Sequence, residues 1–138
     1  MSADNCYLID LPRFSDQRGS LAFAEVGQHV PFELRRIYYL YGVPPTAERG
    51  AHGHRELEQL IIAMAGSVDI EVDDGRQRRS FRLDDPARAL YVCPLIWRDL
   101  RRFSPDAVVL VLASLPYDEN DYFRDYPSFL EAVANPCR

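Results

Sequence analysis

The sequence predicts an all-β fold, either a sandwich or a small barrel, that ends in one short helix. Short runs of β-branched and aromatic residues recur along most of the 138 residues, and glycine, proline, aspartate or serine separates one run from the next. Many short strands at close spacing are typical of these two architectures. A helical pattern occurs only in Pro127–Ala134, where proline suits the first turn and Phe129, Leu130 and Val133 share one side.

The expected strands begin with Cys6–Leu11, which ends at Pro12. A turn over Asp16–Ser20 then leads into a second strand, Leu21–Val26. The next strand, Leu34–Tyr41, is rich in the aromatic and branched side chains that strands favour. The remaining expected strands are short apolar runs divided by turn residues, namely Leu57–Ala65, Ser67–Val72, Ser80–Leu83, Ala89–Val92, Ile96–Phe103 and Val108–Ala113.

Length and composition indicate one domain over residues 1–138, with a partly helical tail from about residue 115. No apolar run is long enough to span a bilayer, and the first residues lack the pattern of a signal peptide, so we expect no membrane association. The cysteines Cys6, Cys93 and Cys137 show no paired spacing, which favours reduced thiols in a cytoplasmic protein. The net charge of -5 argues against nucleic acid as a partner.

Two of the three histidines, His52 and His54, lie close together in the stretch Arg49–Gln59. Side chains two apart on a strand project from the same face, so we expect two imidazoles side by side. Such a pair fits either a metal site or an acid–base site, because imidazole ligates metals and titrates near neutral pH. We interpret Glu58, which follows them, as a partner that orients a histidine or an arginine.

The His-x-His pattern, with Gly50 before it and Glu58 and Gly66 after it, resembles the first motif of the cupin superfamily. In metal-dependent cupins the two histidines and the glutamate bind a divalent ion together with a third histidine from a second motif. Here the second motif falls around Pro94–Asp99, where either Arg98 or Asp99 stands at the expected histidine position, and an arginine cannot ligate a metal. A metal site would then need Asp99 as a fourth ligand, and we expect no metal and no cofactor.

A more specific resemblance covers nearly the whole chain and rests on an ordered series of short segments. They are Asp16-x-Arg18-Gly19-Ser20-Leu21, Pro31-Phe32, Arg36-Ile37-Tyr38-Tyr39-Leu40, Arg49-Gly50-Ala51-His52-Gly53-His54, Leu57-Glu58-Gln59, Asp73-Asp74-Gly75, Leu90-Tyr91-Val92, Val109-Leu110-Val111-Leu112-Ala113 and Tyr117-Asp118-Glu119-x-Asp121-Tyr122. Together they resemble the sugar 3,4-ketoisomerases, or WxcM-like cupins, which act on dTDP-4-keto-6-deoxyglucose. The resemblance implies a homodimeric jelly-roll barrel that makes 3-keto sugars for amination into deoxyamino sugars.

The same resemblance implies that His52 and His54 are the catalytic pair. Moving a ketone from C4 to C3 requires a proton to leave C3, an enediol to form and a proton to return at C4, and histidine can serve both transfers. The sequence leaves open which histidine is the carbon base. A fixed donor such as Arg49 or a tyrosine hydroxyl would stabilise the enediolate. The candidate substrate-binding residues are Arg18, Arg49, Tyr38, Trp97 and Arg98.

Each of these candidates has a structural alternative. Arg18 suits a solvated turn, Arg49 suits a salt bridge at the barrel mouth, and Tyr38 suits the core. Trp97 suits either the core, the pocket wall or a stack on the base. We interpret the acidic segment Asp118–Asp121 as a solvated face or a cap for the terminal helix.

Three other functions compete with the ketoisomerase. A sugar-nucleotide 3,5-epimerase also begins by deprotonating carbon beside the C4 ketone, but it usually uses a histidine–aspartate pair, and no strong aspartate candidate is evident in the sequence. A metal-dependent cupin enzyme would need the metal site discussed above. A non-catalytic sugar-binding cupin would not need His52 and His54, whose presence argues against it.

Overall fold

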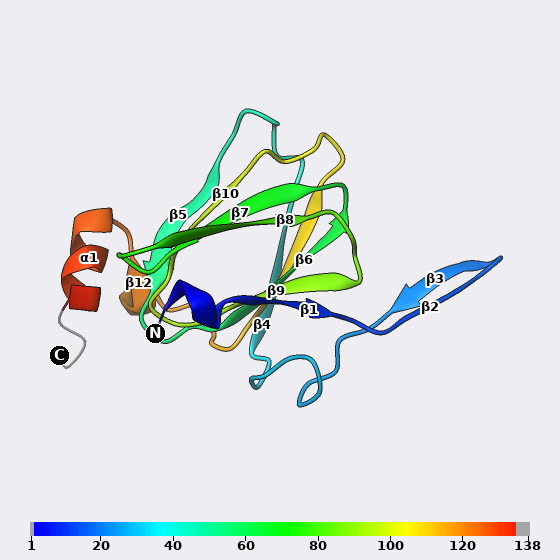
Figure 1. Cartoon of the computed structure of the whole chain (residues 1–138), viewed down its shortest axis with the longest axis horizontal. Coiled ribbons are helices and arrows are strands. Elements are labelled where there is room, and N and C mark those ends of the chain that lie inside the picture. Colours follow the sequence, from blue (N-terminus) through cyan, green and yellow to red (C-terminus); the bar gives the residue numbers. More distant parts are fainter. Residues whose placement is uncertain (1, 135–138) are drawn as a thin grey trace.

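Two five-stranded antiparallel sheets face each other and form a flattened barrel in the computed structural model, which describes residues 2–134 (Figure 1). Cys137 lies outside the described residues. The first sheet has the order β1 (Tyr7–Asp10), β9 (Arg88–Val92), β6 (Gln59–Ala65), β11 (Val108–Ala113) and β4 (Arg36–Tyr41). The second has the order β12 (Tyr122–Phe123), β5 (Arg49–His54), β10 (Trp97–Arg101), β7 (Val68–Asp73) and β8 (Arg78–Leu83).

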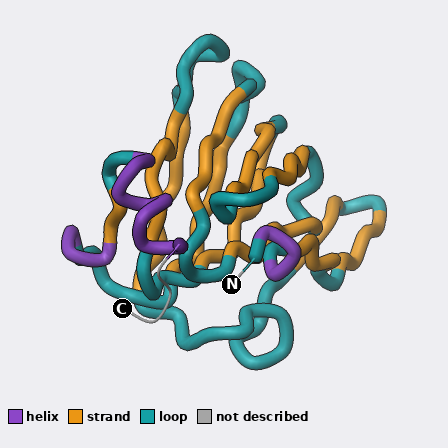
Figure 2. Tube along the Cα trace, turned by 60° about the vertical axis from the view of Figure 1, so that its left-hand side comes forward, coloured by secondary structure: helices purple, strands orange, loops and turns teal. Residues whose placement is uncertain are grey.

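The remaining elements lie outside the two sheets. A hairpin of β2 (Arg13–Asp16) and β3 (Gly19–Ala22) extends away from the barrel, as Figure 1 shows. Two short 3-10 helices, η1 (Ala3–Asn5) and η2 (Glu119–Asp121), precede β1 and β12, and the helix α1 (Tyr126–Ala134) follows β12. Figure 2 shows α1 beside one end of the strands, with the hairpin on the other side of the molecule. Among residues 2–134 no helix is long and apolar enough to cross a bilayer.

The predicted all-β jelly roll with a short C-terminal helix is confirmed, and most predicted strands lie where expected. The expected strand over Leu21–Val26 is wrong in its bounds, because β3 ends at Ala22 and the following segment forms only a single bridge between Val26 and Val30. The sequence also did not reveal β2. All residues of β2 and β3 are exposed, so no alternation of buried and exposed positions marks them as strands.

Alternating side chains from both sheets fill the space between them. On β7, for example, Val68, Ile70 and Val72 are fully buried, while the intervening residues reach the surface. On β4 the alternation directs Tyr38 toward the interior and Tyr39 outward. The interior thus receives one tyrosine of this pair, next to a core of aliphatic side chains.

A second apolar cluster fixes β12 and α1 to the outer face of the second sheet. Trp97, Phe123 and Phe129 form its centre, with the Phe123 and Phe129 rings 5.7 Å apart. Gly53 on β5 makes room for it, since a Cβ there would lie 3.1 Å from the Phe129 ring. The cluster therefore holds β12, and the 3-10 helix before it, against β5.

We predict that Phe129→Ala lowers the free energy of unfolding by about 3–5 kcal/mol, because it removes a fully buried aromatic ring and leaves a cavity. Urea denaturation followed by circular dichroism measures this loss. Leu130→Ala in the same helix is the matched control and should cost less, since Leu130 is only partly buried. Equal losses in the two variants would contradict the role given to Phe129.

Candidate active site

A bulge in β5 positions the two histidines. Across the β5–β10 pair, Arg98 is opposite His52 and Asp99 is opposite Gly50, which leaves Ala51 as the additional residue. Gly50 has a φ of 86° and Ala51 a φ of 53°, in the left-handed region that favours glycine. A Cβ on Gly50 would also lie 2.9 Å from the Arg98 carbonyl oxygen, so the position requires glycine.

Beyond the bulge, His52 and His54 project from the same face, as the sequence predicted. Their ring centroids are 4.9 Å apart and the rings are perpendicular. The Tyr122 ring packs against both, with centroids 4.3 Å from His54 and 5.1 Å from His52. The Arg124 guanidinium lies 3.8 Å from the centre of the Tyr122 ring, so β12 covers the pair from one side.

Asp121 fixes the His54 ring. Nδ1 of His54 donates to Oδ2 of Asp121 at 3.0 Å, and the backbone N–H groups of Glu56 and Leu57 donate to the same carboxylate at 2.7 and 3.3 Å. Burial raises the pKa of Asp121, and these backbone hydrogen bonds oppose the rise. Because a carboxylate accepts the bond, the proton of His54 sits on Nδ1 and Nε2 carries a lone pair.

This arrangement corrects two interpretations of the sequence. Asp121 is buried beside a histidine, so assigning it to a solvated face or a helix cap was wrong, as was the view that the chain offers no aspartate for a histidine–aspartate pair. Glu58, which we expected to orient a histidine or an arginine, instead accepts a hydrogen bond from the Tyr91 hydroxyl at 2.5 Å. Asp121 therefore has the role that the sequence suggested for Glu58.

His52 has the same tautomer for a different reason. Its Nδ1 lies 3.0 Å from the carbonyl oxygen of Gly50, which can only accept, so Nδ1 carries the proton. The Nε2 atoms of His52 and His54 are both buried and have no hydrogen-bond partner among the described residues. Each of these adjacent rings therefore has an Nε2 lone pair that no described residue uses.

Arg98 places a buried positive charge beside this pair. Its side chain is 1% exposed, and its guanidinium donates to Oε1 of Gln59 and, at 2.8 Å, to the carbonyl oxygen of Ile96. Burial lowers the pKa of His52 to about 4, and the charge of Arg98 adds to this effect. Burial and Arg98 also lower the pKa of His54 well below its usual range. Both imidazoles are therefore neutral at pH 7.

A small cavity of about 60 Å³ lies within the barrel beside His52. It is lined by Tyr38, Leu40, Arg49, Gly50, His52, Gln59, Ile61, Arg98, Leu100 and Val111. The Tyr38 oxygen accepts a hydrogen bond from Nε2 of Gln59 at 2.9 Å, and Arg49 is exposed at the edge of the barrel. The structure thus brings together Tyr38, Arg49, His52 and Arg98 around the cavity, and the His54 ring contacts the His52 ring. Gln59 is not among the site residues that the sequence predicted.

Arg18 and Trp97 lie elsewhere in this chain. Arg18 is on the turn of the β2–β3 hairpin, with 87% of its side chain exposed and its guanidinium 2.7 Å from Asp16. Trp97 precedes Arg98 on β10, so it points to the opposite face and packs against Tyr126 and Phe129. The core role that the sequence allowed for Trp97 is the one that the structure shows.

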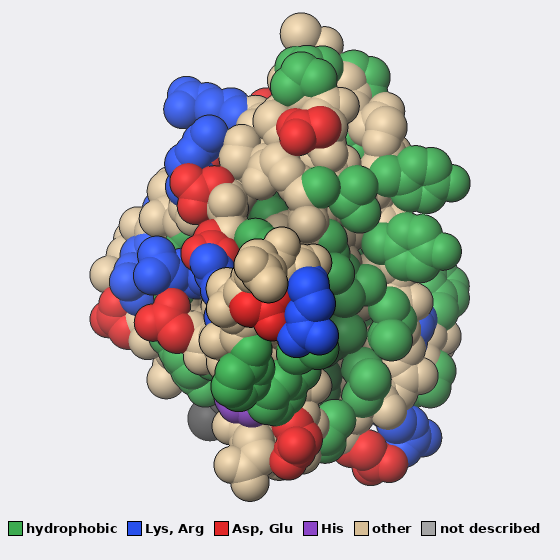
Figure 3. All heavy atoms as spheres, turned by 90° about the vertical axis from the view of Figure 1, so that its right-hand side faces the viewer, with side chains coloured by type: hydrophobic (Ala, Val, Ile, Leu, Met, Phe, Trp, Pro, Cys, Tyr) green, Lys and Arg blue, Asp and Glu red, His purple; other side chains and the backbone are tan. Residues whose placement is uncertain are grey.

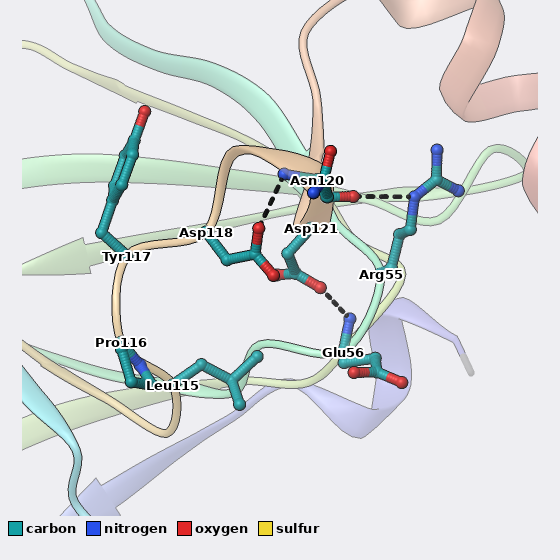
Figure 4. A pocket seen from close by; sticks show the side chains of 8 residues that line it. All are labelled: Arg55, Glu56, Leu115, Pro116, Tyr117, Asp118, Asn120 and Asp121. Carbon is teal, nitrogen blue, oxygen red and sulfur yellow. Dashed lines mark hydrogen bonds between the residues drawn. The ribbon is translucent and has the colours of Figure 1, made fainter.

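A larger hollow of about 540 Å³ lies on the other side of Asp121 (Figure 4). Figure 4 shows the Asp121 carboxylate directed toward the backbone of Glu56, and the Arg55 side chain directed toward the carbonyl oxygen of Asn120. Its lining contains no histidine. The small cavity is the candidate site, because His52 lines it and the His54 ring lies against the His52 ring.

The donor set beside the histidines does not suit a metal ion. Residues 2–134 contain no group of three or more histidine, cysteine, aspartate or glutamate side chains placed to hold one. The position next to His52 is occupied by Arg98, whose guanidinium is a cation and has no lone pair to donate. The expectation that the protein uses no metal stays a prediction, tested by retained activity after prolonged chelation.

The fold and the site define a cupin with a neutral histidine pair suited to proton transfer. The family model "FdtA: WxcM-like, C-terminal" matches residues 4–134. The chain therefore belongs to the WxcM-like FdtA family, as the resemblance in its sequence indicated. It is 39% identical over 127 residues to a TDP-4-oxo-6-deoxy-alpha-D-glucose-3,4-oxoisomerase from Aneurinibacillus thermoaerophilus, a match that covers 92% of this chain and 91% of the relative.

Solved structures agree with this assignment. A 3,4-ketoisomerase from Helicobacter canadensis is 44% identical, with a TM-score of 0.91 over 94% of this chain and 98% of the other. QdtA, a sugar 3,4-ketoisomerase from Thermoanaerobacterium thermosaccharolyticum in complex with TDP, is 35% identical, with a TM-score of 0.94 over 97% and 98%. The 4-keto-6-deoxy sugar epimerase NovW from Streptomyces spheroides, at 22% identity and a TM-score of 0.74, shares the fold.

We predict that the histidine pair makes the protein less stable as the pH falls. The pKa of His52 is about 4 in the folded protein against 6.5 as its ordinary value, so below pH 6.5 the unfolded chain takes up a proton that the folded chain refuses. Stability is therefore lost between pH 6.5 and about 4. Urea denaturation over this range measures the slope, and His52→Asn should flatten it. Parallel curves for wild type and variant would contradict the assignment.

Proposed function

We propose that this protein is a nucleotide-sugar 3,4-ketoisomerase that converts TDP-4-keto-6-deoxyglucose to a TDP-3-keto-6-deoxyhexose. The observation that carries the proposal is the pair of adjacent neutral imidazoles whose Nε2 atoms have no partner among the described residues, with His52 lining a cavity of the barrel. Two relatives support the substrate. The Aneurinibacillus enzyme is named as a TDP-4-oxo-6-deoxy-alpha-D-glucose-3,4-oxoisomerase, and a histidine-to-asparagine mutant of QdtA was solved in complex with TDP-4-keto-6-deoxyglucose.

The two lone pairs suffice for the whole proton movement. One Nε2 takes the C3 proton, and the C3–H electron pair moves toward the C4 carbonyl oxygen to give an enediolate. The other Nε2 takes the proton from the C3 hydroxyl and delivers it to the oxygen on C4. The imidazolium formed first then returns its proton to C4, leaving a ketone at C3. Both imidazoles end as they began, and no external oxidant or reductant is needed.

The side chains around the cavity suit the rest of the substrate. Arg49, exposed at the edge of the barrel, is placed to meet a negatively charged diphosphate, for which a guanidinium is a suitable bidentate partner. Tyr38 and Arg98 lie deeper, where the reacting part of the sugar would enter. Asp121 holds His54 and would stabilise positive charge on it during proton transfer.

A 3,5-epimerase is the second candidate, because the hydrogen bond between His54 and Asp121 supplies the pair that such an enzyme uses. The family to which the chain belongs favours the ketoisomerase, since the epimerase NovW shares only the fold. Incubation with TDP-4-keto-6-deoxyglucose, followed by NMR of the product, separates the two. A ketone at C3 supports the proposal, and a 4-keto sugar inverted at C3 or C5 contradicts it.

We predict that turnover in deuterated water places deuterium at C4 of the product, at least in part, because the imidazolium proton exchanges with solvent. His52→Asn and His54→Asn should each lower the rate by about 10²- to 10⁴-fold, the usual contribution of a general acid–base group. Product NMR and initial rates measure both effects. TDP affinity and molecular mass should stay unchanged as controls. Near wild-type rates in both variants would show that the pair is structural.

The proposal includes a homodimer, as the resemblance implies. Large apolar side chains are exposed on the β2–β3 hairpin and on the outer face of β4; Phe14, Leu21, Tyr39 and Tyr41 are 64%, 59%, 60% and 70% exposed. Figure 3 shows hydrophobic side chains gathered along one side of the end that carries the hairpin. β4 is also an edge strand of the first sheet, and such edges are commonly covered in natural proteins.

A second copy would also explain the position of Arg18. The hairpin extends away from its own barrel (Figure 1). Arg18, at the turn of the hairpin, is not among the residues that line the cavity beside His52. If the apolar side chains of the hairpin pack on a second copy, Arg18 comes near the subunit boundary. We propose that it contacts the nucleotide bound by the partner.

We predict a mass of twice the chain's 15.9 kDa by light scattering at micromolar concentration. Tyr39→Glu should shift the protein toward monomer, because it places a charge within the apolar face. Gln77→Glu, on the turn between β7 and β8, is the matched control and should stay dimeric. A monomeric wild-type protein would contradict the dimer and the role given to Arg18.

Two broader expectations stay proposals. One cupin domain over residues 1–138 is supported by a core cluster that takes side chains from Ala3 to Leu112. A cytoplasmic location stays an expectation that rests on the unpaired spacing of the cysteines in the sequence.

A further inference from the structure

A chain of hydrogen bonds crosses the barrel interior from a buried cation to a tyrosine hydroxyl. The Arg98 guanidinium donates to Oε1 of Gln59, and Nε2 of Gln59 donates to the Tyr38 oxygen at 2.9 Å. Arg98 and Gln59 are each 1% exposed, and all three side chains line the cavity beside His52. The three residues linked by these hydrogen bonds come from three strands, namely β10, β6 and β4.

These hydrogen bonds can run in only one direction, from donor Arg98 through Gln59 to the Tyr38 oxygen. A guanidinium has donors and no acceptor, so it must face the amide oxygen of Gln59. That contact fixes the amide orientation and leaves the NH₂ group to face Tyr38. The Tyr38 oxygen thus uses a lone pair for Gln59, and its hydroxyl hydrogen is left for a different acceptor. A positive charge at the far end polarises each bond in the same sense.

We propose that Gln59 is a positioning residue that holds the Tyr38 hydroxyl as a hydrogen-bond donor to the oxygen on which the enediolate charge develops. The inference rests on the proposed ketoisomerase function and adds to it the group that receives the negative charge. Both imidazoles are unprotonated at Nε2, so neither can donate a hydrogen bond from that atom when the C3 proton first leaves. Tyr38 supplies that donor.

Gln59→Glu is the sharpest test because it reverses the donor and the acceptor in the hydrogen bond between residue 59 and Tyr38. The carboxylate still accepts from Arg98, but it cannot donate to Tyr38, so the Tyr38 hydroxyl donates to the glutamate instead of to the substrate. The variant also gives Arg98 a charged partner, which favours folding. Tyr38→Phe removes the donor itself and keeps the ring.

We expect Tyr38→Phe to lower kcat by about 10²-fold or more, the usual effect of losing one oxyanion donor. Gln59→Glu should lower kcat by at least about 10-fold, with KM and TDP affinity nearly unchanged, because the lost interaction forms only in the transition state. The double variant should be no slower than Tyr38→Phe, since both changes remove the same donor. Tyr91→Phe, which removes the hydroxyl bonded to Glu58 outside the cavity, is the matched control and should keep wild-type kcat.

A spectroscopic measurement tests the relay, that is, the hydrogen bonds from Arg98 through Gln59 to Tyr38, without turnover. The hydrogen bond from Gln59 lowers the pKa of Tyr38, although burial, the larger effect, raises it. Gln59→Glu should therefore raise the pH at which Tyr38 ionises, measured as the ultraviolet difference between each protein and its Tyr38→Phe counterpart. If the glutamate variant does not fold, Gln59→Met, which keeps the length and removes both amide atoms, replaces it with the same expected changes.

The outcomes separate this inference from the proposed function. A wild-type protein that does not isomerise the sugar contradicts the function, and the ionisation shift of Tyr38 then decides on the relay. A wild-type protein that turns over while Gln59→Glu matches its kcat contradicts the relay alone. A loss that appears only in KM, or an additive double variant, makes Gln59 a packing residue and also overturns the inference.

Discussion

The site depends on one buried cation without a carboxylate partner. Arg98 is 1% exposed, and its hydrogen bonds go to neutral acceptors, the side chain of Gln59 and the carbonyl of Ile96. A charge without a directly bonded carboxylate acts strongly in a dry interior. It helps to keep both imidazoles neutral, and it orients the Gln59 amide.

The backbone and a distant carboxylate give the two histidines one tautomer by separate routes. At His52 the β5 bulge brings the Gly50 carbonyl oxygen to Nδ1 as the acceptor. At His54 the acceptor at Nδ1 is the Asp121 carboxylate. The apolar cluster around Phe129 holds β12 against β5, and the short helix with Asp121 leads directly into β12. Packing on the outer face of the second sheet thus determines chemistry on its inner face.

The sequence predicted those features that depend on the two-residue period of a strand. His52 and His54 share a face because alternation requires it. Alternation also requires that one of Tyr38 and Tyr39 points inward, and the structure shows that it is Tyr38. The same rule separates Trp97 from Arg98, since neighbours on β10 cannot both face the cavity. Asp121 escaped prediction, because it lies 67 residues from His54 at the end of a three-residue 3-10 helix that has no periodic pattern. Only the pairing of β12 with β5 brings the two residues together. The sequence did not predict strand β2 for a related reason, because all residues of β2 and β3 are exposed and no alternation of buried and exposed positions marks them.

The central claim is that both imidazoles are neutral, protonated on Nδ1 and unprotonated on Nε2 in the resting protein. Two-bond ¹H–¹⁵N NMR of the histidine rings at neutral pH tests it most directly, with His52→Asn and His54→Asn spectra for assignment. The account predicts that each ring shows a pyrrole-type Nδ1 and a pyridine-type Nε2. A protonated Nε2 on either ring, or an imidazolium at neutral pH, would contradict it.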